Sequence, residues 1–194
     1  LTLTPLHIDE IIAVDRARHQ LVVRGAAALF QSGAFARLPP ADVLPETVAL
    51  SALDVAGAAP QVERLVRGIA GPVSVLILGC GGKSGLLCAA AARRAGAAKI
   101  IGVEVPAAVS ARAAAERLGA FDAIVSADAA DALAVAQAAI AAGGGEFALT
   151  VSCVNGAGAE LGAILATRDR GVVYFFSMAT SFTRAALGAE GVGK

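Results

Sequence analysis

The sequence predicts an α/β protein in which a doubly wound parallel sheet is covered by helices on both faces and follows a β-rich segment. Three observations predict this fold. From Val73 onward, short apolar runs alternate with Ala-rich stretches of helical length. A glycine-rich turn follows the first of these runs, and residues 1–36 instead alternate apolar and polar residues. Regular alternation of strands and helices requires right-handed crossovers, and these place the strands in parallel.

The N-terminal segment, residues 1–36, is expected to be β-rich and antiparallel. Alternating polarity is typical of strands that are half-buried. The strand candidates are residues 21–23 and 27–30. Prolines in the stretch 38–45 interrupt regular structure, so this stretch is a candidate domain boundary.

Residues 47–66 are then predicted to be helical, with a possible interruption near Gly57 and Pro60. Asp54 stands out because it lies in the otherwise apolar run LSALDVAGAAP. A carboxylate in such surroundings is costly unless it meets a partner, water or a ligand. A structural hydrogen bond and a ligand-binding role for Asp54 both remain open.

The run VSVLILGCGGKSG, which starts at Val73, predicts a buried strand followed by a tight turn and a helix. Apolar residues without alternation indicate a strand buried on both faces. Glycines allow the backbone to approach a diphosphate closely, and the N-terminus of the next helix attracts the anion. Lys83 either neutralises the phosphate or points to solvent. The candidate cofactor-binding residues here are Gly79, Gly81, Gly82, Lys83, Ser84 and Gly85.

Glu104 follows this turn by about twenty residues and ends the next predicted strand. An acid at this position of a Rossmann fold accepts the hydroxyls of the adenosine ribose and repels a 2′-phosphate. The spacing therefore favours NAD over NADP as the cofactor. The alternative is that Glu104 only caps the strand or faces solvent.

The remaining elements complete a sheet with the strand order 3-2-1-4-5. We expect the chain to end after a strand and a loop, before a sixth strand. The predicted strands are residues 73–78, 100–103, 123–126, 147–152 and 172–176, and the predicted helices are residues 83–95, 107–118, 130–142 and 157–165.

Ligands of this fold bind at the carboxyl ends of the strands, which draws attention to three further loops. Asp128, in the loop 126–128, is expected to border the adenine. Asn155 and Ser177, in the loops after the fourth and fifth strands, are expected to flank the nicotinamide. The alternative is ordinary turn chemistry, which Asn, Gly and Ser favour in any case.

Charge and hydropathy exclude several classes of partner. The 16 Lys and Arg residues balance the 16 Asp and Glu residues, so no long-range field attracts nucleic acid or an anionic membrane. Apolar runs are interrupted before they reach membrane-spanning length, and no signal peptide is visible. We therefore expect neither a nucleic-acid nor a membrane partner.

The three cysteines, Cys80, Cys88 and Cys153, are odd in number and scattered. A disulfide framework is therefore not expected, and a reducing cytoplasm fits best. Their spacing is not that of a metal site, and they are expected to act as small buried hydrophobic residues. His7 and His19 have no partner at ligand spacing, so we expect no metal ion.

The sequence resembles a known family along nearly its whole length. The layout from GAFARLPP to GCGGKSG is similar to the medium-chain dehydrogenase/reductase superfamily. More specifically, the sequence resembles the family of L-erythro-3,5-diaminohexanoate dehydrogenases, enzymes of lysine fermentation. The most specific string is YFFSMATSF followed by ALGAEGVGK, and further matching stretches are LTPLHIDEI, ALDVAGAAPQ, ILGCGGKSGL, CVN and ATRDRGVVYFFSMATSF.

The resemblance implies an NAD-dependent oxidative deamination of (3S,5S)-3,5-diaminohexanoate to 5-amino-3-oxohexanoate, with release of ammonia. It also implies a homodimer. In this interpretation residues 1–45 are part of a GroES-like catalytic domain, residues 46–70 a helical connection, and residues 71–194 the NAD-binding Rossmann domain without its last strand.

One departure concerns length, because members of this family have a longer N-terminal region and further sequence after GVGK. Zinc-dependent relatives place a cysteine near the position of Asp54, so the resemblance implies no catalytic zinc. We hypothesise instead that Asp54 holds a substrate ammonium group or relays a proton.

Three alternative functions remain open at this point. The first is another medium-chain reductase, such as a quinone or enoyl reductase that uses NADPH, against which Glu104 argues. The second is a non-catalytic dinucleotide sensor. The third is an S-adenosylmethionine-dependent methyltransferase, which combines a similar glycine turn with a later acid.

Overall fold

The computed structural model describes residues 5–17, 20–33 and 37–194 and divides the chain into two compact units, Leu1–Glu46 and Thr47–Lys194. His19 lies outside the described residues. In the order of the chain, the elements are β1 Leu6–Asp15, β2 Gln20–Ala27, α1 Glu46–Ala52, α2 Ala58–Gly68, β3 Ser74–Leu78, α3 Lys83–Arg94, β4 Lys99–Glu104, α4 Val109–Leu118, β5 Ala123–Ser126, α5 Ala132–Gly143, β6 Phe147–Ser152, α6 Glu160–Ala166, β7 Thr167–Phe175 and α7 Phe182–Val192.

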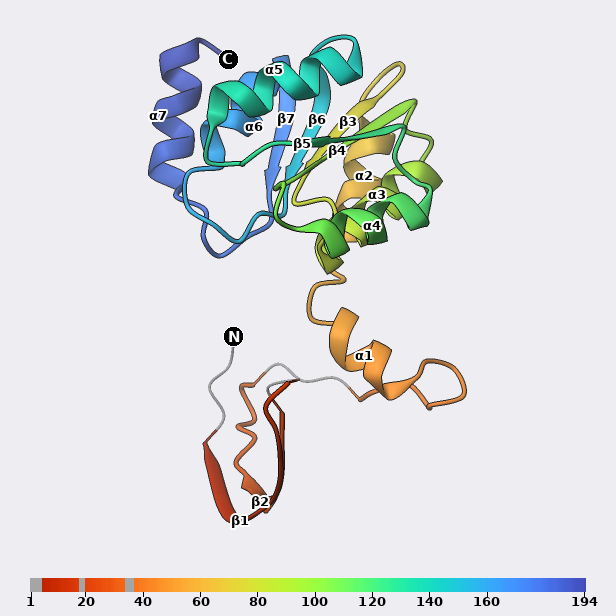
Figure 1. The fold of residues 1–194 in the computed structure, drawn as a ribbon, viewed down its shortest axis with the longest axis vertical. Helices are drawn as coiled ribbons and strands as arrows, with labels where there is room; N and C mark the ends of the chain where they lie inside the picture. Colours follow the sequence, from red (N-terminus) through yellow and green to blue (C-terminus); the bar gives the residue numbers. More distant parts are fainter. Residues whose placement is uncertain (1–4, 18–19, 34–36) are drawn as a thin grey trace. The chain divides into compact units, whose positions relative to one another are not determined.

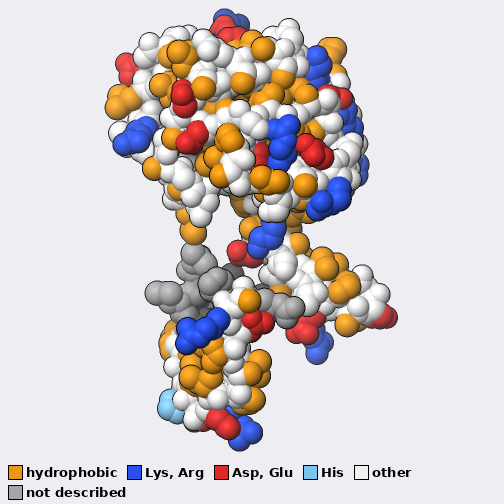
Figure 2. All heavy atoms as spheres, in the orientation of Figure 1, with side chains coloured by type: hydrophobic (Ala, Val, Ile, Leu, Met, Phe, Trp, Pro, Cys, Tyr) orange, Lys and Arg blue, Asp and Glu red, His pale blue; other side chains and the backbone are white. Residues whose placement is uncertain are grey.

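In the first unit, β1 and β2 form an antiparallel hairpin with two register irregularities. The antiparallel pairing is as predicted, but β2 ends at Ala27, so the expected strand at residues 27–30 is wrong. Leu6, Ile11 and Leu21 are among its exposed apolar side chains, and hydrophobic atoms are visible over this unit (Figure 2). None of its described residues is buried.

The second unit contains a parallel sheet with the order β5-β4-β3-β6-β7. This is the predicted doubly wound arrangement, and Figure 1 shows helices on both of its faces. Successive β3 residues point to opposite faces: Val75 and Ile77 pack with α2, α3 and α4, whereas Leu76 and Leu78 pack with α5 and α6. Burial on both faces explains why the strand sequence is continuously apolar.

Two further expectations are corrected at the end of the chain. Residues after the last strand do not form only a loop, because α7 spans Phe182–Val192. The last strand is also longer than predicted: β7 starts at Thr167, and Thr167 pairs with Phe147 before the register shifts. Within this irregular part of β7, Arg170 has a positive φ of 55°.

The predicted helical region is interrupted near Gly57 as expected, but Pro60 lies within the first turn of the second helix, α2. The helices α1 and α2 are separated by a turn segment that includes Gly57. Of these two helices, α2 contributes the buried valines Val62 and Val66 to the core, whereas α1 buries only Ala49. Among the helices of the described residues, none is both long and apolar enough to cross a membrane.

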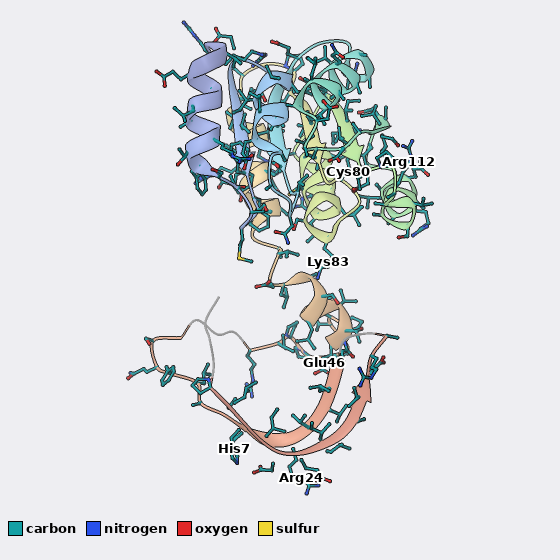
Figure 3. The ribbon with its side chains drawn as sticks, turned by 60° about the vertical axis from the view of Figure 1, so that its left-hand side comes forward. His7, Arg24, Glu46, Cys80, Lys83 and Arg112 are labelled. Atoms are coloured by element: carbon teal, nitrogen blue, oxygen red, sulfur yellow. The ribbon has the colours of Figure 1, made fainter. Side chains whose placement is uncertain are left out.

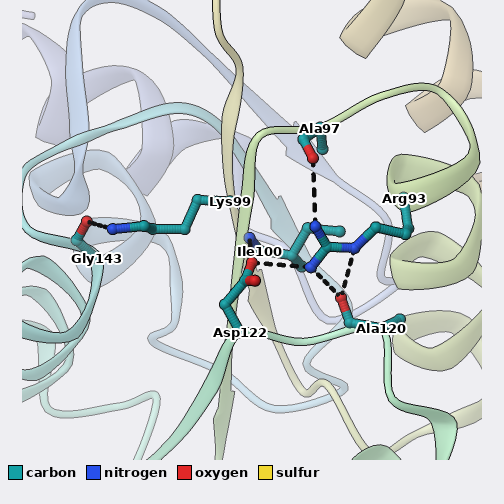
Figure 4. Close-up of polar contacts among 7 residues, drawn as sticks. All are labelled: Arg93, Ala97, Lys99, Ile100, Ala120, Asp122 and Gly143. Atoms are coloured by element: carbon teal, nitrogen blue, oxygen red, sulfur yellow. Dashed lines mark hydrogen bonds and ion pairs between the residues drawn. The ribbon is translucent and has the colours of Figure 1, made fainter.

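A polar cluster joins elements at the amino ends of β4 and β5 (Figure 4). Asp122 accepts a hydrogen bond from the Ile100 N–H at 2.6 Å and from Arg93 at 2.8 Å. The same guanidinium donates to the Ala120 carbonyl at 2.8 Å. Burial would raise the pKa of Asp122, but the Ile100 N–H and Arg93 together lower it below its ordinary value. This cluster lies at the end of the sheet opposite to the glycine turn.

Candidate functional site

The glycine turn follows β3 at the carboxyl end of the sheet, at the point where the strand order reverses. Gly79 has a φ of +72°, a conformation that favours glycine. A Cβ on Gly79 would lie 3.3 Å from the Cys153 backbone, so the turn also packs closely on the loop after β6.

The other glycines of the turn have different surroundings. A Cβ on Gly81 would lie 2.2 Å from the Ala111 carbonyl oxygen, and one on Gly85 would lie 2.3 Å from the Gly79 carbonyl oxygen. These two positions therefore need glycine for packing of the protein itself. Gly82 is different, because its nearest contact would be 3.5 Å away and the residue is exposed. Only Gly82 offers open space toward a ligand.

Glu104 ends β4, and both of its carboxylate oxygens bind backbone. Oε2 accepts a hydrogen bond from the Gly81 N–H at 2.9 Å, and Oε1 accepts one from the Val105 N–H at 3.1 Å. Glu104 therefore fixes the glycine turn directly, a role that the spacing alone did not predict. Each oxygen keeps further lone pairs that can accept ribose hydroxyls.

A cleft of about 400 Å³ opens beside this turn. It brings together five of the predicted cofactor-binding residues from four different strand ends: Gly79, Gly82, Glu104, Asp128 and Asn155. Val103, Val105, Ala127 and Val154 provide apolar walls. An apolar cleft with a few convergent polar groups is typical of a small-molecule site.

Lys83 and Ser84 form the first turn of α3 rather than the wall of the cleft. Gly82 is the N-cap of α3, and no side chain caps this helix end. The first backbone N–H groups of α3, which have no partner within a helix, are therefore not bound by a capping side chain. Lys83 is exposed and Ser84 half-buried. Lys83 and the buried Cys80 are labelled in Figure 3.

The three loops at the carboxyl edge differ in what they contribute. Asp128 lines the cleft, and its Oδ1 accepts a hydrogen bond from the Ala130 N–H, which is turn chemistry. Asn155 is exposed on the wall of the cleft. Ser177 does not line it, and its hydroxyl accepts a hydrogen bond from the Ala179 N–H at 3.1 Å. The ligand roles of these residues stay predictions.

Asp54 is not placed as expected from the sequence. It lies in the exposed turn between α1 and α2, not within an apolar helix. Water can therefore solvate its carboxylate, and the predicted cost of burial does not arise. No hydrogen bond or ion pair joins Asp54 to any other described residue. Its role toward a substrate stays a prediction.

The three cysteines gather beneath the cleft as free thiols. Cys80 and Cys88 are buried, and Cys153 is half-buried on the wall of the cleft. Burial, followed by the Glu104 carboxylate, raises the pKa of Cys80 to about 12. A hydrogen bond with Cys88, followed by burial, raises the pKa of Cys153. The raised pKa values keep the Cys80 and Cys153 thiols protonated at neutral pH, so both act as packing groups.

Two charged residues of this region escaped the sequence analysis. Arg112 of α4 donates to the Ser126 hydroxyl and, at 3.0 Å, to the Ile124 carbonyl, so it ties α4 to the end of β5. It is labelled in Figure 3. Glu160, at the start of α6, accepts a hydrogen bond from the Ser181 N–H at 2.7 Å. The only sequence signal was the i,i+4 pair of Arg112 with Glu116, which is typical of any helix surface.

Metal ligation finds no support in the part of the chain that the structure describes. No group of three or more His, Cys, Asp or Glu side chains there could hold a metal ion. His7 is exposed and lies 3.1 Å from Asp9.

Comparison with known sequences confirms the resemblance noted above. Residues 1–39 match the family model for the L-erythro-3,5-diaminohexanoate dehydrogenase N-terminal domain. Two curated relatives, from Acetoanaerobium sticklandii and Fusobacterium nucleatum, carry the name L-erythro-3,5-diaminohexanoate dehydrogenase. Each is 45% identical over 197 residues, covering 100% of this chain and 55% of the relative. The chain thus spans about half the length of these relatives.

Comparison with solved structures confirms the fold. The structure of a mycobacterial protein complexed with NADPH matches with a TM-score of 0.61 at 21% identity. The match covers 79% of this chain and 46% of the mycobacterial chain. L-idonate 5-dehydrogenase from Escherichia coli matches with a TM-score of 0.57 at 20% identity. That match covers 78% of this chain and 41% of the dehydrogenase. These structures show that the chain has the fold of medium-chain oxidoreductases.

Proposed function

We propose that this protein is an NAD-dependent dehydrogenase that converts (3S,5S)-3,5-diaminohexanoate to 5-amino-3-oxohexanoate and releases ammonia. The observation that carries this proposal is the 45% identity, along the whole chain, to two relatives named for that activity. The cleft at the switch point of the sheet supports it, because this is where Rossmann folds bind dinucleotides. The balanced reaction also consumes NAD⁺ and one water and yields NADH and a proton.

The residues of the cleft fit a dinucleotide. The steric need for glycine at Gly81 and Gly85 keeps the turn tight, and the open space at Gly82 leaves room for a diphosphate. The N–H groups of the first turn of α3 would bind the phosphates, and Lys83 and Ser84 add donors there. Asp128 would border the adenine, and Asn155 and Ser177 the nicotinamide. When bound, the nicotinamide accepts a hydride from C3 of the substrate.

Glu104 supports NAD rather than NADP as the cofactor. Its carboxylate lies at the end of β4 on the wall of the cleft, where an acid accepts ribose hydroxyls. A 2′-phosphate placed there would meet a like charge without a compensating cation, because Arg112 already binds Ser126, Ile124 and Glu116.

Asp54 is our candidate for binding the substrate. Its solvated carboxylate has no protein partner among the described residues, so it is available to an ammonium group. The reacting amine must lose a proton before C3 can release hydride, and a carboxylate can relay that proton. If Asp54→Asn retained wild-type turnover and Michaelis constant, this role would be excluded. Asp42→Asn, an exposed acid outside any helix or strand, is the matched control.

The remaining proposals concern the setting of the enzyme. The match of residues 1–39 to an N-terminal domain model supports residues 1–45 as a separate domain, which we assign as part of the catalytic domain. The parallel sheet with its cleft supports residues 71–194 as the NAD-binding domain, and residues 46–70 are then the connection. The family resemblance supports a role in lysine fermentation. Three free thiols support a reducing cytoplasm, and the resemblance supports a homodimer.

The decisive experiment measures NADH formation when the purified protein receives NAD and (3S,5S)-3,5-diaminohexanoate. Lysine and simple alcohols serve as control substrates, and NADP as the control cofactor. Turnover with the diamino acid and NAD alone is the expected result. Tight NADH binding without turnover of the diamino acid would contradict the proposed substrate but not the proposed cofactor. Absence of NADH binding would contradict both.

A further inference from the structure

Glu160 is the only acidic or basic side chain that is buried within the described residues, with 4% of its surface exposed. A buried carboxylate is costly unless hydrogen bonds compensate for lost water. Its Oε1 accepts a hydrogen bond from the Ser181 backbone N–H at 2.7 Å. Its position in the first turn of α6 also places its negative charge at the positive end of that helix.

The bond from Ser181 completes the N-terminal cap of a different helix. Ser181 is the N-cap of α7, and its hydroxyl accepts a hydrogen bond from the Arg184 N–H at 3.3 Å. In a capping box, the third helical residue is Glu or Gln and accepts the N–H of the N-cap residue in return. Here that third residue is Arg184, which offers no side-chain acceptor. Glu160 supplies the missing acceptor from α6 and so determines where α7 begins.

This bond also fixes one end of the loop between β7 and α7. At the other end, the Phe176 N–H donates to the Ser152 carbonyl at 2.9 Å. Between these anchors lie Ser177 and Met178, and the side chain of Met178 is 82% exposed. The loop after β6, which includes Asn155, leads directly into Glu160. One carboxylate therefore couples the two loops at the carboxyl ends of β6 and β7.

We propose that Glu160 is a positioning residue that holds these two loops in place for the nicotinamide half of the cofactor. The inference rests on the proposed function, in which Asn155 and Ser177 flank the nicotinamide. The adenosine and diphosphate half is bound elsewhere, by the glycine turn and by Glu104 at the ends of β3 and β4. Loss of Glu160 should therefore weaken only ligands that carry a nicotinamide.

The test compares the affinities of NADH and ADP-ribose, which lacks the nicotinamide, by calorimetry. Glu160→Ala should weaken NADH binding about tenfold and leave ADP-ribose within about twofold, because one charge-assisted hydrogen bond is lost at one end only. Glu160→Gln keeps an acceptor of the same size, so NADH affinity should stay close to that of the wild type. Glu190→Ala removes an exposed acid from α7 and serves as the control.

Hydrogen exchange of the Ser181 amide gives a second measurement that does not depend on cofactor. Exchange should accelerate about tenfold in Glu160→Ala and stay unchanged in Glu160→Gln. Unchanged exchange in Glu160→Ala would overturn the coupling of the loops. Equal losses for NADH and ADP-ribose, or no loss for either, would overturn the nicotinamide role while the proposed function stands. A wild-type protein that binds neither NADH nor ADP-ribose would overturn the proposed function and the nicotinamide role together. Hydrogen exchange of the Ser181 amide would still test whether Glu160 holds the two loops together.

Discussion

Glu104 combines two tasks that a substitution can separate. Its Oε2 accepts a hydrogen bond from the Gly81 N–H, which holds the glycine turn, and in the proposed function its charge disfavours a 2′-phosphate. Glu104→Gln keeps an acceptor but removes the charge, so the turn should persist while the preference for NAD over NADP falls about tenfold or more. The ratio of the two kcat/KM values measures this preference.

Glu104→Ala provides the complementary variant. It removes the acceptor as well as the charge, so the Gly81 N–H loses its partner and affinity for both cofactors should fall. A Glu104→Gln protein with the wild-type ratio would show that the charge does not set the preference. Glu116→Gln, which changes an exposed acid on α4, controls for the loss of one negative charge.

Asp122 offers a prediction about pH. Its pKa is lowered in the folded protein, so the unfolded chain binds its proton at higher pH than the folded chain does. Its stabilisation is therefore present above the ordinary Asp pKa of about 4 and is lost as the pH falls through the lowered folded value. Asp122→Asn should lower the free energy of unfolding by about 1 kcal/mol at pH 7, a value that allows for solvent screening.

Urea unfolding at pH 7 and at acidic pH measures this effect. The difference in free energy of unfolding between Asp122→Asn and the wild type should become smaller at acidic pH. Asp169→Asn changes an exposed acid that lies 3.9 Å from Arg170, so it should be close to neutral at either pH. A difference that is constant with pH would show that Asp122 acts by hydrogen bonding without its charge.

At the residue level, the sequence predicted those side chains whose neighbours are set by chain geometry. Glu104 follows a strand at a spacing that the fold itself imposes, so it lies on the cleft as expected. Glu160 could not be found in this way, because its partner Ser181 is 21 residues away and the contact depends on how α6 and α7 pack. The placement of Asp54 failed because an apolar run predicts burial, whereas this run forms an exposed turn.

At the level of elements, continuous apolar runs and glycine stops predicted the strands and their order. The helix α7 was missed because Gly188 and Gly191 lower its intrinsic propensity. Packing against α6 compensates: a Cβ on Gly188 would lie in ordinary van der Waals contact with Leu161 and Ile164, at 3.4 Å, so α6 and α7 lie close together. Such tertiary support is invisible in local sequence.

The glycine turn yields a prediction that distinguishes fold from ligand binding. Gly85→Ala places a Cβ 2.3 Å from the Gly79 carbonyl oxygen, so it should destabilise the fold by about 1–3 kcal/mol or more. Gly82→Ala meets nothing closer than 3.5 Å and should leave stability unchanged, but its methyl group would occupy the space expected for the diphosphate. Thermal unfolding and NADH titration of both variants measure the two effects. Equal NADH affinity in Gly82→Ala and the wild type would show that the diphosphate does not approach this residue.

At the level of the whole molecule, the two units differ in how completely they fold around a core. The central strands β3, β4 and β6 are buried between helices on both faces of the sheet, whereas the described residues of the β1–β2 unit include none that is buried. An isolated two-stranded hairpin is at best marginally stable in water. The sequence predicted both units from their different periodicities. It could not predict that every described residue of the first unit is at least partly exposed, because exposure depends on what surrounds the strands.

The second unit should therefore bind cofactor without the first. A chain that starts at Thr47 retains the sheet, the glycine turn and every residue of the cleft. We expect it to fold and to bind NADH with an affinity within about threefold of the whole protein, because independent domains keep their own sites. NADH at about 100 times its dissociation constant should raise the free energy of unfolding of both proteins by about 2.7 kcal/mol. The melting temperatures of the whole and the shortened protein should therefore rise to a similar extent. Turnover of the diamino acid should disappear in the shortened protein, because the proposed catalytic segment is removed. A shortened protein that folds but does not bind NADH would show that residues 1–46 complete the cofactor site.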